Sequence, residues 1–139
     1  MRFTIHADGG SRGNPGPAGA GAVIRDEGGS TVAVVSKFLG VQTNNFAEYE
    51  AVIAALDVLL SRVPEEERRG VRVLIKMDSQ LVVKQMRGEY KVKHPNIKPQ
   101  YARLSERAAK FGSVTFTHVY REENGDADAL ANEAMDRGA

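Results

Sequence analysis

Four acidic residues of this chain stand where their side chains could bind metal ions together. Two of them directly follow strand-like stretches, and the other two fall in the first turns of expected helices. Carboxylate oxygens, without cysteine or paired histidines beside them, suit Mg²⁺ or Mn²⁺ rather than zinc. Two such ions about 3.5–4 Å apart can activate water and stabilise the leaving oxygen of a phosphodiester. The four residues are Asp8, Glu48, Asp78 and Asp128.

Each of these residues also has a purely structural explanation. Glu48 lies three residues after Asn45, the spacing of a capping box, and Asp78 could cap the helix that follows it. A helix dipole would favour Asp128, and Asp8 could stabilise its own glycine-rich turn. Four carboxylates that converge on one sheet edge would nevertheless repel one another unless cations neutralise them. The element order predicts such convergence, because ligands of open α/β sheets bind at the carboxyl ends of the strands.

The stretch from Asp8 to Pro17 is unusually rich in residues that break regular structure. It contains four glycines and two prolines, whereas a turn needs only one or two such residues. We expect its backbone to approach a ligand closely, with the carboxylate of Asp8 at the edge.

The composition is typical of a globular protein. The 139 residues are 42% hydrophobic and 27% charged, and 19 Lys+Arg against 18 Asp+Glu leave a net charge of +1. The lack of cysteine excludes disulfides and fits a reducing, cytoplasmic compartment. A strand pattern begins almost at the N-terminus and no apolar run approaches about 20 residues, so we expect neither a signal peptide nor a membrane partner. We expect a single domain, residues 1–139, that acts as a monomer.

Charge is unevenly distributed along the chain. Five basic residues and a single acid lie between Lys84 and Lys98, whereas acids dominate the stretch from Glu122 to Asp136. A basic patch beside an acidic focus suggests a protein that binds an anion and carries out metal chemistry on it. The alternative is that both stretches are solvated helix faces.

The elements that must position these residues follow from hydrophobic periodicity and turn residues. Their order, βββαβααβα, predicts an α/β fold with a five-stranded mixed sheet, its first three strands antiparallel, and helices on both faces. The expected strands are residues 3–7, 20–25, 31–39, 71–77 and 114–120, and the expected helices are residues 45–63, 80–86, 99–111 and 127–135.

Four motifs in order resemble those of type 1 ribonuclease H. They are "DGGSRGNPGPAGAG", "TNNFAEYEA", "MDSQLV" and "REENGDADALAN". The resemblance implies a ribonuclease H-like fold and hydrolysis of the RNA strand of RNA/DNA hybrids, leaving 3′-hydroxyl and 5′-phosphate ends. It also implies that the four carboxylates hold two Mg²⁺ ions, for which Mn²⁺ would substitute.

The resemblance further implies a set of substrate-binding residues. Glycines would let the backbone approach a minor groove in which RNA displays its 2′-hydroxyls, and the amides of Asn14, Asn44 and Gln80 would read those hydroxyls. Thr43 would hold a phosphate of the DNA strand, and Asn96 matches another such position. A turn is the alternative role for Asn14, and a helix cap is the alternative for Asn44. The set is Gly9, Gly10, Asn14, Thr43, Asn44, Gln80 and Asn96.

The chain departs from the family pattern in two places. The basic region after the second helix is short and lacks tryptophan, as in the archaeal-type and short bacterial branch. The loop before the last helix lacks the histidine that many members carry. Auxiliary candidates in this loop are Arg121, Glu122 and Asn124, whereas the histidines His6, His94 and His118 are expected to be structural or solvated.

Two other functions stay open at this point. One is a nuclease of the same superfamily that also cuts double-stranded RNA. The other is a hybrid-binding module without catalysis, although an intact set of four carboxylates would then bring repulsion without benefit.

Overall fold

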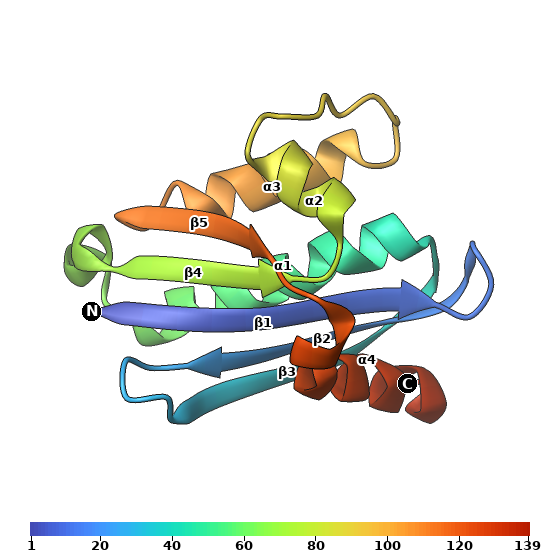
Figure 1. Ribbon diagram of the computed structural model, residues 1–139, viewed down its shortest axis with the longest axis horizontal. Helices are drawn as coiled ribbons and strands as arrows, with labels where there is room; N and C mark the ends of the chain where they lie inside the picture. The colour runs from blue at the N-terminus through green and yellow to red at the C-terminus, as the bar shows by residue number, and fades with distance from the viewer.

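A mixed five-stranded sheet forms the centre of the molecule in the computed structural model, which describes residues 1–139. Its strand order is β3-β2-β1-β4-β5; β1, β2 and β3 are antiparallel, and β4 pairs in parallel with both β1 and β5 (Figure 1). This confirms the predicted sheet. The strands are β1 (Arg2–Ser11), β2 (Gly16–Arg25), β3 (Thr31–Gln42), β4 (Arg72–Met77) and β5 (Ser113–His118).

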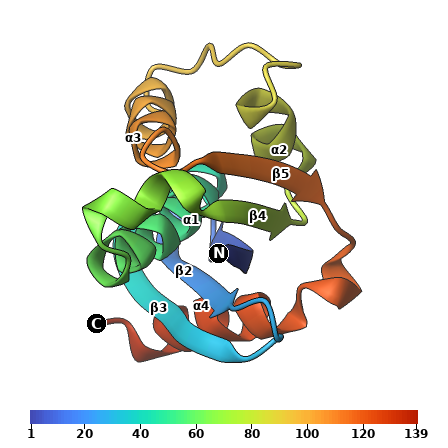
Figure 2. The ribbon, with the colours of Figure 1, turned by 90° about the vertical axis from the view of Figure 1, so that its left-hand side faces the viewer.

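Helices cover both faces of this sheet. Helix α1 packs on β1, β2 and β3 from one side, with α3 packed against α1, and α4 packs on the same three strands from the other side (Figures 1 and 2). None of these helices combines the length and the apolar character that a membrane span requires. The helices are α1 (Asn44–Arg62), α2 (Gln80–Met86), α3 (Lys98–Ala108) and α4 (Gly125–Arg137), with short 3₁₀ turns η1 (Glu65–Gly70) and η2 (Arg121–Glu123).

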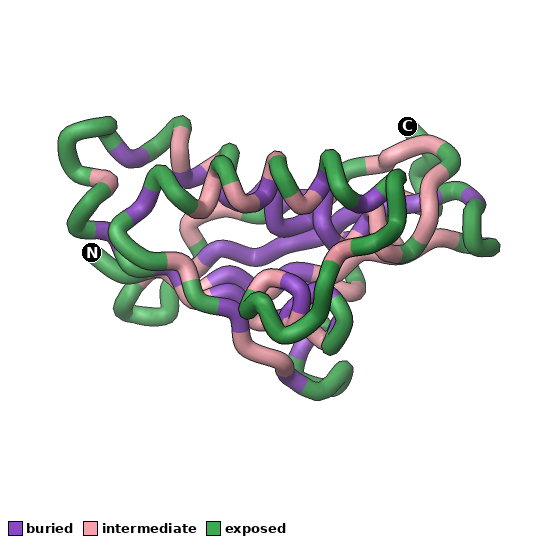
Figure 3. Tube along the Cα trace, turned by 90° about the horizontal axis from the view of Figure 1, so that it is seen from above, coloured by how far each residue is buried: buried purple, intermediate pink, exposed green.

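The core lies between the sheet and α1. Alternate residues of the central strands, such as Ile5 and Ala7 in β1 and Val73 and Ile75 in β4, are fully or almost fully buried, and Figure 3 shows this burial along the central strands. Because side chains of a strand alternate between faces, the residues between them point to the face on which α4 packs. Asp8 belongs to that second set.

The first strand is longer than predicted. Its pairing with β4 ends at Ala7, but its antiparallel pairing with β2 continues to Ser11. The glycines that suggested a turn therefore extend the strand, because β2 begins early, at Gly16, and supplies hydrogen-bonding partners. Asp8 thus lies within β1, at the point where its neighbour β4 ends, rather than at the end of the strand.

The capping box considered as an alternative role for Glu48 does not form. Thr43 caps α1, because its Oγ1 accepts a hydrogen bond from the Phe46 amide at 3.2 Å. Asn45 is already helical, so it forms no capping box with Glu48, and that side chain is free for another role. In α2 the cap is Ser79 rather than Asp78, because the Ser79 Oγ accepts a hydrogen bond from the Val82 amide.

Two glycines allow helices to lie directly on the sheet. A Cβ atom on Gly9 would stand 2.2 Å from the carbonyl oxygen of Ala47 in α1. On the opposite face, a Cβ atom on Gly21 would stand 2.3 Å from the carbonyl oxygen of Ala127 in α4. Neither position tolerates a side chain without moving backbone.

We therefore expect Gly9→Ala to destabilise the protein by about 2 kcal/mol or more, since overpacking against backbone forces α1 to shift. Gly10→Ala is the matched control on the same strand, because its Cβ would meet nothing closer than the Asn44 Oδ1 at 3.8 Å. Urea unfolding followed by circular dichroism measures both free energies. Equal losses in the two variants would contradict the proposed close packing.

Candidate active site

One pocket of about 750 Å³ gathers the four carboxylates at the point where β4 ends. Asp8 comes from β1, Asp78 from the residue after β4, Glu48 from α1 and Asp128 from α4. The other residues that line it are Gly9, Gly10, Ser11, Arg12, Asn44, His118, Val119, Tyr120, Arg121, Ala131, Asn132 and Met135. Carboxylates that are separated along the chain by up to 120 positions thus share one site.

Each carboxylate reaches the pocket from its own element. Asp8 and Asp78 share a sheet face, because they continue the alternation of β1 and of β4. The backbone amide of Gly9 donates to the Asp8 Oδ1 at 3.0 Å, which fixes the orientation of that carboxylate. Asp128 lies in the first turn of α4 as predicted. Glu48 was predicted in the first turn of its helix but lies just beyond it, because α1 already begins at Asn44.

A second glutamate, Glu50, fixes the orientation of helix α1 about its own axis. Glu50 is 5% exposed and bonds to Lys37 on β3 at 3.2 Å and to Arg103 on α3 at 2.9 Å. It also accepts from the Gln100 Nε2 at 3.0 Å. Burial opposes ionisation of Glu50, but these hydrogen bonds and the Arg103 charge lower its pKa overall. Because Glu50 is fixed on one side of the helix, Glu48 is directed into the pocket.

The carboxyl groups of Asp8 and Glu48 have raised pKa values. Burial, then the charge of Asp78 and the neighbouring Asp128, holds the pKa of Asp8 well above its usual range. Burial raises the pKa of Glu48 to about 7, against the opposing effect of the Ser79 hydroxyl and with a further rise from Asp78. Burial is the largest cause in both cases, and the like charge of neighbouring carboxylates adds to it.

The donor set fits a hard divalent cation by its chemistry. Mg²⁺ and Mn²⁺ prefer carboxylate oxygens, and a positive charge would remove the repulsion that raises the pKa of Asp8 and of Glu48. No three Asp, Glu or His side chains already surround one cation position. The chain therefore supplies a pocket of oxygen donors rather than a closed coordination shell, consistent with cations that also keep waters or substrate oxygens as ligands.

A hydrogen-bonded loop places amide donors beside the carboxylates. The Oδ1 of Asn44 accepts from the Ser11 amide at 2.8 Å, and the Oδ1 of Asn14 accepts from the Asn44 amide at 3.1 Å. Because both amide oxygens accept from backbone N–H groups, their orientation is fixed by the network. Each side chain is left with an Nδ2 donor for a ligand.

The remaining predicted binding residues lie either in a second hollow or on the exposed surface. Asn14, Thr43 and Asn44 line a second hollow of about 390 Å³, which His94 and Ile97 close from the other side. Asn96 is exposed beside this hollow, with its backbone amide donating to the His94 Nδ1. Gln80 begins α2 and is exposed outside the pocket. His94 is exposed, in line with the expectation that it is structural or solvated, and it lines the same hollow as three predicted binding residues.

The loop before α4 sends only one of its three predicted residues into the pocket. Arg121 lines the pocket and has no acidic partner in the chain. Glu122 lines a separate hollow beside His6 and Arg25. Asn124 is 1% exposed, and its Nδ2 donates to the Ala7 carbonyl at 2.9 Å, so it ties the loop to β1.

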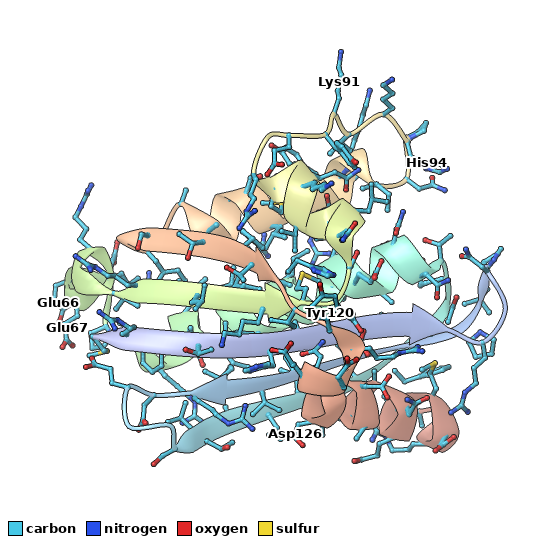
Figure 4. All side chains as sticks on the ribbon, viewed as in Figure 1. Glu66, Glu67, Lys91, His94, Tyr120 and Asp126 are labelled. Atoms are coloured by element: carbon cyan, nitrogen blue, oxygen red, sulfur yellow. The ribbon has the colours of Figure 1, made fainter.

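Among the pocket residues that sequence reasoning missed, three side chains lie on or near the last loop and helix. His118 lines the pocket, rather than being merely structural, and its ring meets that of Tyr120 edge to face with centroids 5.6 Å apart. Tyr120 is 67% exposed and lies on the segment that crosses in front of β1 (Figure 4). Asn132 is the third, one turn after Asp128. The strand pattern of β5 shows that His118 lies at the end of the strand. The path of the segment that follows, which the pattern does not reveal, brings His118 and Tyr120 to the carboxylates.

Comparison with known proteins identifies relatives over the whole chain. Residues 6–134 match the family model described as reverse transcriptase-like. The chain is 46% identical over 140 residues to the "Bifunctional protein Rv2228c" of Mycobacterium tuberculosis, with all of this chain and 37% of that protein covered. It is 43% identical to a "Ribonuclease HI" of Halobacterium salinarum, with 95% of this chain and 64% of that protein covered.

A solved structure is similar at the level of the backbone. LC11-RNase H1 in complex with an RNA/DNA hybrid matches with a TM-score of 0.88 and 44% identity, covering 97% of each chain. The chain thus spans about a third of the mycobacterial relative, but nearly the whole of this structure.

The raised pKa of Glu48 predicts how stability depends on pH in EDTA. Its pKa rises from 4.5 to about 7 on folding, so the folded state binds the proton more tightly and loses stability as pH increases through that window. Glu48→Gln removes this loss and is expected to be more stable than the parent by roughly 3 kcal/mol at pH 8, and about equally stable near pH 4.

Glu50→Gln, two residues along the same helix, is the control with the opposite sign. The pKa of Glu50 is lowered on folding, so its ionised form stabilises the protein above the unfolded pKa. This variant is expected to lose stability at neutral pH and to recover as the pH falls. Urea unfolding between pH 4 and 8 measures both, and a Glu48→Gln curve parallel to the parent would contradict the electrostatic account.

Proposed function

This chain belongs to the type 1 ribonuclease H family, and on that premise we propose that it hydrolyses the RNA strand of RNA/DNA hybrids. The observation that carries the proposal is the convergence of Asp8, Glu48, Asp78 and Asp128 in one pocket beside free amide donors. The products would be 3′-hydroxyl and 5′-phosphate ends. The 139 residues would act as one catalytic domain, either alone or within a longer chain.

The carboxylates would hold two divalent cations, with Mg²⁺ as the working ion and Mn²⁺ as a substitute. When bound, the cations would supply activation of the attacking water and neutralisation of charge on the departing 3′ oxygen. Asp8 and Asp78 lie on one sheet face and are suited to share the ions. Glu48 and Asp128 approach from helices on opposite faces and would complete one ion each.

Selection of RNA would rest on the amide donors. An Nδ2 group of Asn44 or Asn14 can donate to a 2′-hydroxyl oxygen, which DNA lacks. Gly9 and Gly10 add no side chain between the backbone and a minor groove. Thr43 and the α1 N-terminus would hold a phosphate of the DNA strand, since backbone N–H groups and the helix dipole favour an anion there.

Two basic regions would complete the substrate contacts. Arg121 faces the pocket with its guanidinium unpaired, and we assign to it the part that a loop histidine plays in other members of the family. Lys91 and Lys93 are exposed on the connection between α2 and α3. That connection stands away from the sheet in Figure 4, where Lys91 points outward. Each phosphate contact there would add a salt-dependent increment of affinity.

Cleavage of three labelled duplexes tests the activity: RNA/DNA, RNA/RNA and DNA/DNA, each with Mg²⁺, Mn²⁺ or EDTA. We expect cutting of only the RNA strand in the hybrid, none in EDTA, and a loss of about 10³-fold or more in Asp128→Asn, because several kcal/mol of charge stabilisation are removed. Glu133→Gln, an exposed change on the same helix, should retain full rate.

The other outcomes of this assay are equally informative. Cutting of RNA/RNA as well would identify a broader nuclease of the same superfamily. Hybrid binding without cutting in either metal would identify a binding module and would overturn the proposal.

A second test isolates the amide donor of Asn44. Asn44→Asp keeps an oxygen to accept from Ser11 but removes the Nδ2 donor, so we expect the rate of RNA cleavage to fall roughly 10–100-fold, the value of one or two hydrogen bonds in a substrate site. Asn45→Asp adds the same charge one residue away and controls for repulsion of phosphates. Equal loss in both variants would mean that charge, not the amide, is responsible.

A further inference from the structure

One part of the sheet has no helix on the α4 side. Helix α4 packs on β1, β2 and β3, and Figure 2 shows it at the β3 end of the sheet, away from β5. The segment that joins β5 to α4 crosses in front of β4 and β1 (Figure 1). Beyond this crossing, the face is formed by alternate residues of three strands, including Arg72 and Leu74 in β4 and Thr115 in β5.

A hollow of about 800 Å³ lies at the end of this face where the strands begin. All of its charged lining residues are arginines: Arg2, Arg69 and Arg72. Strand register places Arg2 beside Arg72 and Arg72 beside Ser113, whereas Arg69 comes from the turn before β4.

These arginines are free to bind a ligand. None of the three forms an ion pair or a side-chain hydrogen bond within the chain. The nearby Glu27 is engaged by the backbone amide of Arg2 at 2.9 Å. Glu66 and Glu67 lie on the same turn as Arg69 but do not line the hollow (Figure 4).

The chemistry of the lining fits phosphate. Arginine forks bind phosphate oxygens in pairs, and the hydroxyls of Ser113 and Thr115 add neutral donors of the kind that proteins place on a nucleic-acid backbone. An isolated anion would need fewer groups than three arginines spread over three elements. Successive phosphates of one strand match such a spread.

The arginine hollow and the active-site pocket lie at opposite ends of the same two strands, β1 and β4. From Arg72 to Asp78, or from Arg2 to Asp8, β4 and β1 advance six residues, about 20 Å. Tyr120 lies at the pocket end of this face, exposed on the crossing segment (Figure 4). An exposed aromatic ring beside a basic track is the usual arrangement for single-stranded nucleic acid, since bases stack on the ring.

We infer that this face binds a single-stranded extension of the substrate, running from the active-site pocket past Tyr120 to the arginine hollow. The inference rests on the proposed function and adds a second substrate site to it. A stacked strand rises about 3.4 Å per nucleotide, so about six unpaired nucleotides are needed to reach Arg72. Shorter extensions would not touch the hollow.

The test compares hybrids of eight base pairs that are blunt or carry an extension of two or ten nucleotides, on either strand and at either end. Binding is measured by fluorescence anisotropy over a salt series in the Asp8→Asn background, so that the RNA stays intact. One polarity of the ten-nucleotide extension should tighten binding about tenfold at low salt. The two-nucleotide extension should behave as the blunt hybrid.

Arg69→Gln/Arg72→Gln should abolish this gain and leave the blunt hybrid unaffected. The salt slope for the extended hybrid should decrease by about 1.4, the value for two lost single-strand phosphate contacts. Arg62→Gln is the control, since Arg62 is an exposed arginine at the end of α1 that does not line the hollow.

Several results would overturn the inference. They are no gain for any ten-nucleotide extension, a gain that the double variant retains, and an equal effect of the double variant on blunt and extended hybrids. Inorganic phosphate or polyglutamate that binds the hollow without an extension effect would identify a free-anion or acidic-protein site instead. Cleavage of the blunt hybrid by the chain with Asp8 intact is scored separately, and its failure would overturn the proposed function rather than this site alone.

Discussion

The site depends on two helices that lie directly on the backbone of the central strands. Gly9 faces the carbonyl of Ala47 on one side of the sheet, and Gly21 faces the carbonyl of Ala127 on the other. In each helix the next residue is a carboxylate, Glu48 or Asp128. Side chains at the glycines would push both helices outward. The helix carboxylates would then move away from Asp8 and Asp78 on the strands. Close packing and site geometry are therefore one constraint.

This packing holds together groups that repel one another. Asp8 and Glu48 have raised pKa values because burial and neighbouring acids disfavour their ionised forms. The Glu50 cluster, with its lysine and arginine partners, stabilises α1 against that repulsion. The stable core thus carries a locally unfavourable cluster of charge, and such a cluster is what gives a divalent cation a reason to bind.

The sequence predicted the element order, the sheet type and the convergence of four carboxylates, because periodicity and the edges of parallel strands determine them. It failed where several local partners compete. Thr43 and Asn45 both suit a helix cap, and only the path from β3 selects Thr43. The orientation of His118 toward the pocket and the burial of Asn124 depend on how the last loop crosses the sheet. The arginine hollow could not be predicted from the sequence for a similar reason, because strand register brings together residues some 70 positions apart.

Proton release on cation binding would show whether the crowded carboxylates form the metal site. Mn²⁺ is titrated into the protein at pH 7 by calorimetry in two buffers that differ in ionisation enthalpy. We expect specific binding with release of about one proton or more, a release that decreases above pH 8 and is reduced in Glu48→Gln. Binding without proton release, or the same release in Glu48→Gln, would contradict the claim that the crowded carboxylates form the metal site.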